Sequence, residues 1–250
     1  MTRLFMNVNS KVNDEVKIEG EDARYLSGVL RMRLGEKITI VNEAKEEYDC
    51  TVTGFDKKSV TVTVDDIQEN RTEPPYEAVI YQSVSKGERM DYTIQKAVEL
   101  GADRIVPVFS ERCIVKNESG KSSKIDRWQK IAEEAARQSG RGIVPKVCEP
   151  MDFAGAVKSA SDGEVKIFAW EEEKEQSLKE ILHERHAQLG EGNKRPVINI
   201  FIGPEGGFTE EEAKFAEDNG FSLVTLGPRI LRTESAAPCV LSMLIYEFEL

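Results

Sequence analysis

The sequence has few of the side chains that bind metals or form disulfides. It contains only four cysteines and two histidines in 250 residues. No two cysteines have the C-x-x-C spacing of a zinc site or a redox dithiol. The histidines, His183 and His186, have no apparent third ligand nearby and are typical of a solvated helix face. We therefore expect buried free thiols and no metal site.

Long hydrophobic runs are also absent. The longest nearly unbroken apolar stretches, at Val197–Ile202 and Cys239–Phe248, reach about ten residues or fewer, whereas a membrane-spanning helix needs roughly twenty. The first residues, Met1 to Phe5, lack the apolar core of a signal peptide. We expect a cytoplasmic protein with no membrane segment.

The chain is poor in positive charge, with a formal net charge of −11, which argues against a general nucleic-acid binder. The charge is uneven. Residues 86–146 hold 13 Lys/Arg and 9 Asp/Glu, a net of +4, whereas residues 147–250 hold 10 and 20, a net of −10. A basic stretch on an acidic body is compatible with local phosphate contacts. An ordinary solvated surface is the alternative.

The pattern of apolar residues changes near residue 72. Residues 1–72 are mostly β-like, with one short helix expected over Asp22–Leu30, and several short strands with polar turns indicate a small barrel. The polar segment Gln68–Pro75 ends in two prolines and is the best linker. The expected strands are Arg3–Val8, Val16–Ile18, Lys37–Val41, Tyr48–Phe55 and Ser59–Val64.

From residue 76 to 250, strand-like runs alternate with helix-like segments, which predicts an α/β domain with a largely parallel sheet. The expected strands are Ala78–Val84, Arg104–Phe109, Glu164–Trp170, Val197–Ile202 and Ser222–Leu226. The expected helices are Met90–Leu100, Ile125–Gln138, Ser177–Gln188, Glu210–Asn219 and Ala237–Phe248. The acidic run Glu171–Glu173 is interpreted as a solvated loop.

Two glycine-containing loops near the C-terminus carry most of the functional information. Gly203-Pro204-Glu205-Gly206-Gly207-Phe208 follows one apolar run, and Leu226-Gly227-Pro228-Arg229-Ile230-Leu231-Arg232-Thr233-Glu234-Ser235-Ala236 follows another. A strand that ends in such a loop and leads into a helix presents free backbone groups. Two loops from neighbouring strands would form one backbone-lined pocket for a flat, polar, small ligand.

The spacing of the first loop excludes some ligands. No Gly-Lys-Ser/Thr follows it, so it is not a Walker phosphate loop, and it does not match the dinucleotide fingerprint. Gly206 and Gly207 permit close backbone approach. Thr209 is an expected helix N-cap with Glu212 as its capping-box partner. Taken alone, this loop is equally compatible with a plain strand–turn–helix connection that binds nothing.

Taken together, four separated motifs resemble the ribosomal RNA small subunit methyltransferase E family, 16S ribosomal RNA uridine N3-methyltransferases of the SPOUT superfamily. The resemblance covers essentially the whole chain. Its motifs are Val29-Leu30-Arg31 with Gly35, Gln95–Gly101, Glu134–Arg141 and the two loops. The sequence departs from the family's pattern at Tyr25, where histidine is common, and at Asn42–Lys45, where a glycine-containing turn is common.

The resemblance implies a C-terminal SPOUT domain with a trefoil knot and an N-terminal PUA-like β-barrel that binds RNA. It also implies that the two loops hold S-adenosylmethionine, with S-adenosylhomocysteine as product. The cofactor-binding residues would be Ile202, Gly203, Pro204, Gly206, Gly207, Leu226, Gly227, Ile230 and Leu231.

Arg232 and Glu234, at the end of the second loop, are the candidate catalytic residues. A guanidinium would favour the negative charge that spreads onto O2 and O4 of uridine as N3 is methylated. A carboxylate could accept the N3 proton. Because N3 lies on the Watson–Crick edge, the base must be unpaired or flipped out. An ordinary ion pair, or a carboxylate at a helix N-terminus, is the structural alternative.

Two groups of residues are candidate RNA contacts. Arg24, Arg31 and Arg33 cluster in one short segment, although Arg24 could instead brace the short helix. The resemblance places Arg137, Gln138 and Arg141 on an active-site face, but cations also suit a helix C-terminus there.

The partners implied are 16S ribosomal RNA or the small ribosomal subunit and a second copy of the chain. The apolar residues of the last helix support a homodimer, although packing on their own sheet is an equal alternative. The alternative functions are a non-catalytic ribosome-associated RNA-binding protein and a knotted ribose 2′-O-methyltransferase.

Overall fold

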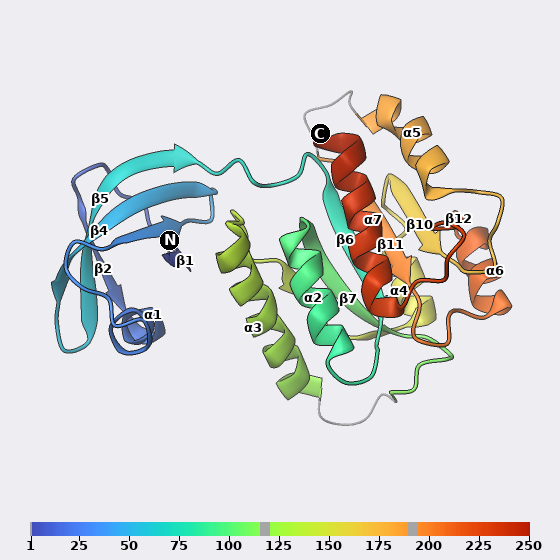
Figure 1. Cartoon of the computed structure of the whole chain (residues 1–250), viewed down its shortest axis with the longest axis horizontal. Coiled ribbons are helices and arrows are strands. Elements are labelled where there is room, and N and C mark those ends of the chain that lie inside the picture. The colour runs from blue at the N-terminus through green and yellow to red at the C-terminus, as the bar shows by residue number, and fades with distance from the viewer. Residues whose placement is uncertain (1, 116–120, 190–194) are drawn as a thin grey trace. The chain divides into compact units, whose positions relative to one another are not determined.

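The computed structural model describes residues 2–115, 121–189 and 195–250 (Figure 1). The chain divides into two compact units: Met1–Glu73 with Ala136–Val144, and Pro74–Ala135 with Pro145–Leu250. We expected two contiguous domains, 1–72 and 76–250. The structure instead assigns the segment 136–144, which lies far along the chain, to the first unit, and each unit is described by itself.

The first unit is built on a five-stranded sheet in the order β1-β3-β4-β5-β2. β1 and β3 pair in parallel and the other neighbours are antiparallel. The strands are β1 Thr2–Phe5, β2 Glu15–Glu19, β3 Lys37–Val41, β4 Glu46–Phe55 and β5 Ser59–Glu69. All five expected strands form, and β5 extends into the segment expected to be the linker.

Alternation along the strands directs one face of this sheet into a core. In β2 the side chains alternate between exposed and buried, with Val16 and Ile18 inside. The helix expected over Asp22–Leu30 forms as α1, Gly20–Arg24, followed directly by a π-helical turn, η1, Tyr25–Val29. Its Leu26 is fully buried in the same core.

A buried ion pair ties segment 136–144 to the rest of the first unit. Arg141 is 2% exposed, and its Nε and a terminal guanidinium nitrogen donate to the two carboxylate oxygens of Glu73 at 2.9 and 2.7 Å. Burial alone would raise the pKa of Glu73, but Arg141 and the Gly142 backbone N–H hold it below its ordinary value. This placement removes Arg141 from the candidate RNA contacts.

The second unit is an α/β fold whose sheet has the strand order β12-β10-β11-β6-β7-β8, with β9 also paired to β7. Every pairing is parallel, as expected. The strands are β6 Glu77–Ser83, β7 Ala102–Phe109, β8 Lys146–Val147, β9 Met151–Asp152, β10 Val165–Ala169, β11 Val197–Ile202 and β12 Ser222–Val224. The helices are α2 Arg89–Glu99, α4 Phe153–Ser159, α5 Leu178–Leu189, α6 Glu210–Asp218, α7 Thr233–Phe248 and α3 Lys121–Ser139, whose residues 136–139 belong to the first unit.

Helices cover both faces of this sheet, so the central strand β11 is buried from Ile198 to Ile202 (Figure 1). α7 packs against α2 and α5 on one face. On the other face, α4 and α6 enclose an aromatic cluster in which Tyr81 stacks on Phe201 at 4.4 Å between ring centroids. The trefoil knot stays a prediction.

Some sequence expectations were incomplete. α4 and the short strands β8 and β9 were not predicted. The C-terminal helix begins at Thr233, four residues before the expected Ala237. His183 is largely exposed, as a solvated helix face requires, whereas the side chain of His186 lies outside the described residues. No helix in the described ranges has the length and apolar character needed to cross a bilayer.

We expect Arg141→Met to lower the free energy of unfolding by about 3–5 kcal/mol, because Glu73 would remain buried without its partner. Urea denaturation measures this. Arg104→Met is the control, since its pair with Glu77 has side chains 45% and 32% exposed and should contribute about 1 kcal/mol or less. Equal losses in both variants would contradict the structural role of Arg141.

The same pair predicts a pH dependence. The pKa of Glu73 is lower in the folded protein than its ordinary value of 4.5. The stabilisation is therefore complete above about pH 4.5 and is lost as the pH falls through the folded pKa. The destabilisation caused by Arg141→Met should accordingly shrink in strongly acidic buffer.

Candidate functional site

Three loops meet at the carboxyl edge of the parallel sheet in the second unit. β10 lies between β11 and β12 in the sheet, so the segments that follow these three strands leave it side by side. This edge is where open parallel sheets bind ligands. The two glycine-containing loops follow β11 and β12, and the acidic segment after β10 completes the set.

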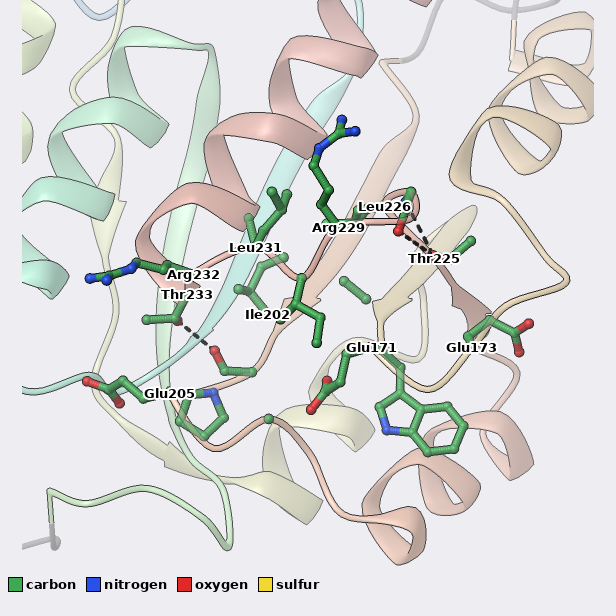
Figure 2. A pocket seen from close by; sticks show the side chains of 18 of the residues that line it. Glu171, Glu173, Ile202, Glu205, Thr225, Leu226, Arg229, Leu231, Arg232 and Thr233 are labelled. Carbon is green, nitrogen blue, oxygen red and sulfur yellow. Dashed lines mark hydrogen bonds between the residues drawn. The ribbon is translucent and has the colours of Figure 1, made fainter.

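A cavity of about 1010 Å³ lies among these loops (Figure 2). The end of β10 with its loop supplies Ala169, Trp170, Glu171, Glu173 and Lys174, and the end of β11 with its loop supplies Ile202, Gly203, Pro204, Glu205 and Gly207. The segment from Thr225 through Glu234, with Ala236, forms a third wall, and Arg89 from α2 contributes as well.

The structure brings together nearly all of the predicted cofactor-binding residues. Those that line the cavity are Ile202, Gly203, Pro204, Gly207, Leu226, Gly227, Ile230 and Leu231. Gly206 is the exception. Its carbonyl accepts a hydrogen bond of 3.0 Å from Arg112, and an added Cβ would lie 3.3 Å from the Cβ of Arg112. The Cβ side of Gly206 therefore faces Arg112, and a cofactor contact at Gly206 stays a prediction.

Two glycines in the cavity wall adopt backbone conformations that other residues rarely reach. Gly207 has φ +68° and Gly227 has φ +113°. At Gly207 there is a second constraint, since an added Cβ would overlap the carboxylate of Glu171. A close approach between two of the loops therefore depends on the absence of a side chain at Gly207.

A buried hydrogen-bond chain joins the loop after β11 to the segment that follows β12. The Thr233 hydroxyl donates to the Gly203 carbonyl at 2.6 Å (Figure 2). The same hydroxyl accepts from Nε2 of Gln82 at 2.9 Å. Gln82 is fully buried at the end of β6. No local signal in the sequence indicates that Gln82 and Thr233 meet, because they are 151 residues apart.

An arginine of α2 lies between two carboxylates of the cavity. Arg89 donates to Glu205 at 2.7 Å, and its Nε is 3.7 Å from Oε2 of Glu234. Burial opposes ionisation of Glu205, but hydrogen bonds from the Lys86 backbone N–H and from Arg89 hold its pKa below the ordinary value. Oε2 of Glu234 is buried and, among the described residues, has no hydrogen-bond partner.

Both predicted catalytic residues line the cavity. Arg232 occupies the N-cap position of α7, and Glu234 lies in the first turn of that helix. Arg232 is exposed, and Figure 2 shows its side chain extending to the same side of the cavity as that of Glu205. A cation and a carboxylate with an unused oxygen are thus close in the chain and reachable from one cavity.

The candidate RNA contacts all belong to the first unit. Arg24, Arg31, Arg33 and Gln138 are exposed. Arg24 donates to the Gly20 carbonyl at 3.3 Å, so it braces α1, as the alternative anticipated. Arg31 has φ +52°.

Arg137 is partly occupied within this unit. It lies 3.5 Å from Asp22 and places its guanidinium 5.5 Å from the centre of the Tyr25 ring, the position where the family commonly has histidine. In the basic stretch 86–146, Lys116 and the side chain of Lys121 lie outside the described residues. The described residues contain no group of three or more His, Cys, Asp or Glu that could hold a metal ion.

Comparison with known proteins gives consistent results for the two units. A family model described as an RNA methyltransferase domain matches residues 72–245, and an RNA methyltransferase PUA domain model matches residues 18–65. The ribosomal RNA small subunit methyltransferase E of Bacillus subtilis is 32% identical, with 100% of this chain and 98% of that protein covered.

Two similar solved structures contain a cofactor. A ribosomal RNA small subunit methyltransferase E from Neisseria gonorrhoeae, bound to S-adenosyl methionine, is 32% identical with a TM-score of 0.81 and covers 98% of this chain and 97% of its own. A Legionella pneumophila structure with bound cofactor SAM is 30% identical with a TM-score of 0.83, at the same coverage.

Proposed function

Because the chain belongs to the ribosomal RNA small subunit methyltransferase E family, we propose that it transfers a methyl group from S-adenosylmethionine to N3 of a uridine in 16S ribosomal RNA. The observation that carries this proposal is the cavity at the carboxyl edge of the sheet, which holds both glycine loops together with Arg232 and Glu234. The relatives' names supply the substrate class and the cofactor.

The residues of the cavity fit this cofactor. The volume of about 1010 Å³ lies at the upper end of the range for small-molecule sites. The carboxylates and apolar walls suit a ligand that carries hydroxyl groups, a cation and a flat base. Ile202, Leu226 and Leu231 supply apolar surface, and Gly203 and Gly207 let backbone approach closely.

Bound S-adenosylmethionine supplies an electrophilic methyl group on its sulfonium. The guanidinium of Arg232 stabilises the negative charge that develops on O2 or O4 of the uridine. Glu234, which lies in the first turn of α7 and in the cavity wall, takes the N3 proton. Arg89 lies in ion-pair range of Glu234, with its Nε 3.7 Å from Oε2.

The test is to incubate the protein and S-adenosylmethionine with small subunits that lack the modification, and to identify the methylated nucleoside by mass spectrometry. We expect N3-methyluridine. A 2′-O-methyl product would establish the ribose-methylating alternative, and no product despite cofactor binding would support the non-catalytic one. Arg232→Met should lower kcat by about 10²–10³-fold. Glu234→Gln should lower it by about 10²–10⁴-fold.

The matched controls are Lys214→Met and Glu217→Gln, exposed positions on α6 outside the cavity wall. They make the same changes of charge and should leave kcat unchanged. Cofactor affinity of the Arg232 and Glu234 variants should stay within roughly threefold of the parent. A large loss of affinity would instead make them binding residues.

We also propose that the first unit contributes RNA affinity. It carries the match to an RNA methyltransferase PUA domain, and Arg31 and Arg33 are exposed on it. Val29 and Leu34 are 70% and 65% exposed in the same segment. Basic side chains next to exposed apolar ones suit phosphates and unpaired bases together.

The double variant Arg31→Gln/Arg33→Gln should weaken RNA binding. It should also reduce the magnitude of the slope of log affinity against log salt by about 1.4, because a protein with two fewer phosphate contacts releases fewer counterions when it binds. Filter binding over a salt series measures this. Lys57→Gln/Lys58→Gln is the control, since both lysines are exposed in the turn between β4 and β5. Identical slopes for the two double variants would reject the assignment.

A homodimer is the proposed assembly. Val240, Leu241 and Leu244 of α7 are buried within their own unit, so they do not require a partner. Exposed apolar side chains near the same helix do support one: Ile230, Tyr246 and Leu250 are 84%, 76% and 94% exposed. Since the proposed substrate is ribosomal RNA, we place the protein in the cytoplasm.

Light scattering should give a mass near twice 28.1 kDa, and Tyr246→Glu should shift it toward the monomer, because a charge would be buried at the interface. A mass of one chain for the parent protein at working concentration would rule out the dimer.

A further inference from the structure

Four carboxylates line the cavity: Glu171, Glu173, Glu205 and Glu234. Three have partners. Glu205 accepts from Arg89 and Lys86, and Glu234 lies in ion-pair range of Arg89. Glu173 accepts hydrogen bonds from the backbone N–H groups of Glu175 and Gln176 at 2.7 and 3.0 Å, so its carboxylate binds backbone groups of its own loop.

Glu171 differs from the other three. Among the described residues it makes neither a hydrogen bond nor an ion pair, yet its carboxylate lies against Gly207 in the opposite loop. Figure 2 shows it pointing toward the side where Glu205 lies, whereas Glu173 points the other way. Among the described residues, Glu171 is therefore the one carboxylate of the cavity wall without a hydrogen-bond or ion-pair partner.

The position of Glu171 limits which groups of a ligand could bind its carboxylate. It follows β10, the strand next to β11, so its carboxylate and the glycine loop stand at the ends of adjacent parallel strands. In dinucleotide-binding sheets an acidic residue in a comparable place accepts hydrogen bonds from ribose hydroxyls, beside a glycine loop that the ligand approaches closely. A carboxylate has two acceptor oxygens, which match two vicinal hydroxyls.

We propose that Glu171 recognises the ribose of the cofactor, accepting hydrogen bonds from its 2′- and 3′-hydroxyls. This rests on the proposed function, since it assumes that S-adenosylmethionine occupies the cavity. Gly207 then has two roles: it adopts φ +68°, and it leaves the room in which the Glu171 carboxylate lies. Glu171 and Glu172 are exposed, as expected for a solvated loop, and the same segment forms a specificity-determining wall of the cavity.

The alternative partners of the carboxylate are the sulfonium and the α-ammonium group, and three ligands separate them. S-adenosylmethionine has the ribose, the sulfonium and the ammonium. S-adenosylhomocysteine lacks the sulfonium charge, and 5′-methylthioadenosine lacks both cations. Calorimetric titration of each into the full chain gives the affinities without any need for turnover.

We expect Glu171→Gln to weaken binding of all three ligands by the same factor, about 10- to 100-fold, because each loses hydrogen bonds to a charged acceptor. Glu172→Gln is the matched control. It removes the same charge from the neighbouring position, which is exposed and outside the cavity wall, and should bind as the parent does.

The other outcomes overturn the proposal. A loss confined to S-adenosylmethionine would assign Glu171 to the sulfonium, and a loss that spares 5′-methylthioadenosine would assign it to the ammonium. Unchanged affinity in a folded Glu171→Gln variant would leave it without a binding role. If the parent chain binds none of the three ligands, the proposed function itself fails, which is a separate result.

Discussion

The cavity depends on one hydroxyl. Thr233 accepts a hydrogen bond from buried Gln82 and donates one to the carbonyl of Gly203, so it fastens the start of α7 to the loop after β11. Gln82 is anchored at the end of a central strand, in the interior of the second unit. An unmade hydrogen bond at a buried site costs about 1–3 kcal/mol, so the two loops are held as a pair. Arg232 and Glu234 flank Thr233 in the chain, so this connection also holds the segment that carries them.

The two units hold their arginines in different ways. In the first unit, Arg141 is committed to Glu73 and Arg24 to its own helix, which leaves Arg31 and Arg33 exposed. In the second unit, Arg89 serves two carboxylates in a cavity wall. Charge type alone does not separate these roles, because a guanidinium in a buried bidentate pair stabilises the fold, whereas an exposed one is available to phosphate.

Predictions from local sequence were confirmed where a single segment determines its own structure. The capping box of Thr209 and Glu212 forms as expected, and β3 and β11 have their expected bounds. Signals that were weak locally were missed. α4 contains Gly155, which lowers helix propensity, although its N-cap Asp152 accepts a hydrogen bond from the Gly155 N–H at 2.7 Å. The acidic run was expected to be a solvated loop, and Glu171 and Glu172 are indeed exposed, but no local signal indicated that Glu171 lines a cavity.

The sequence by itself determined the α/β class of the second unit, its parallel sheet and the pair of glycine loops, because apolar periodicity and glycine positions are properties of short segments. Only the tertiary structure decided which side of each loop faces the cavity. Gly206 and Gly207 are adjacent, yet one faces Arg112 and the other faces Glu171. The side that each glycine faces follows from the order of the strands and from backbone angles such as the φ of +68° at Gly207. Neither can be deduced from two adjacent glycines in a sequence.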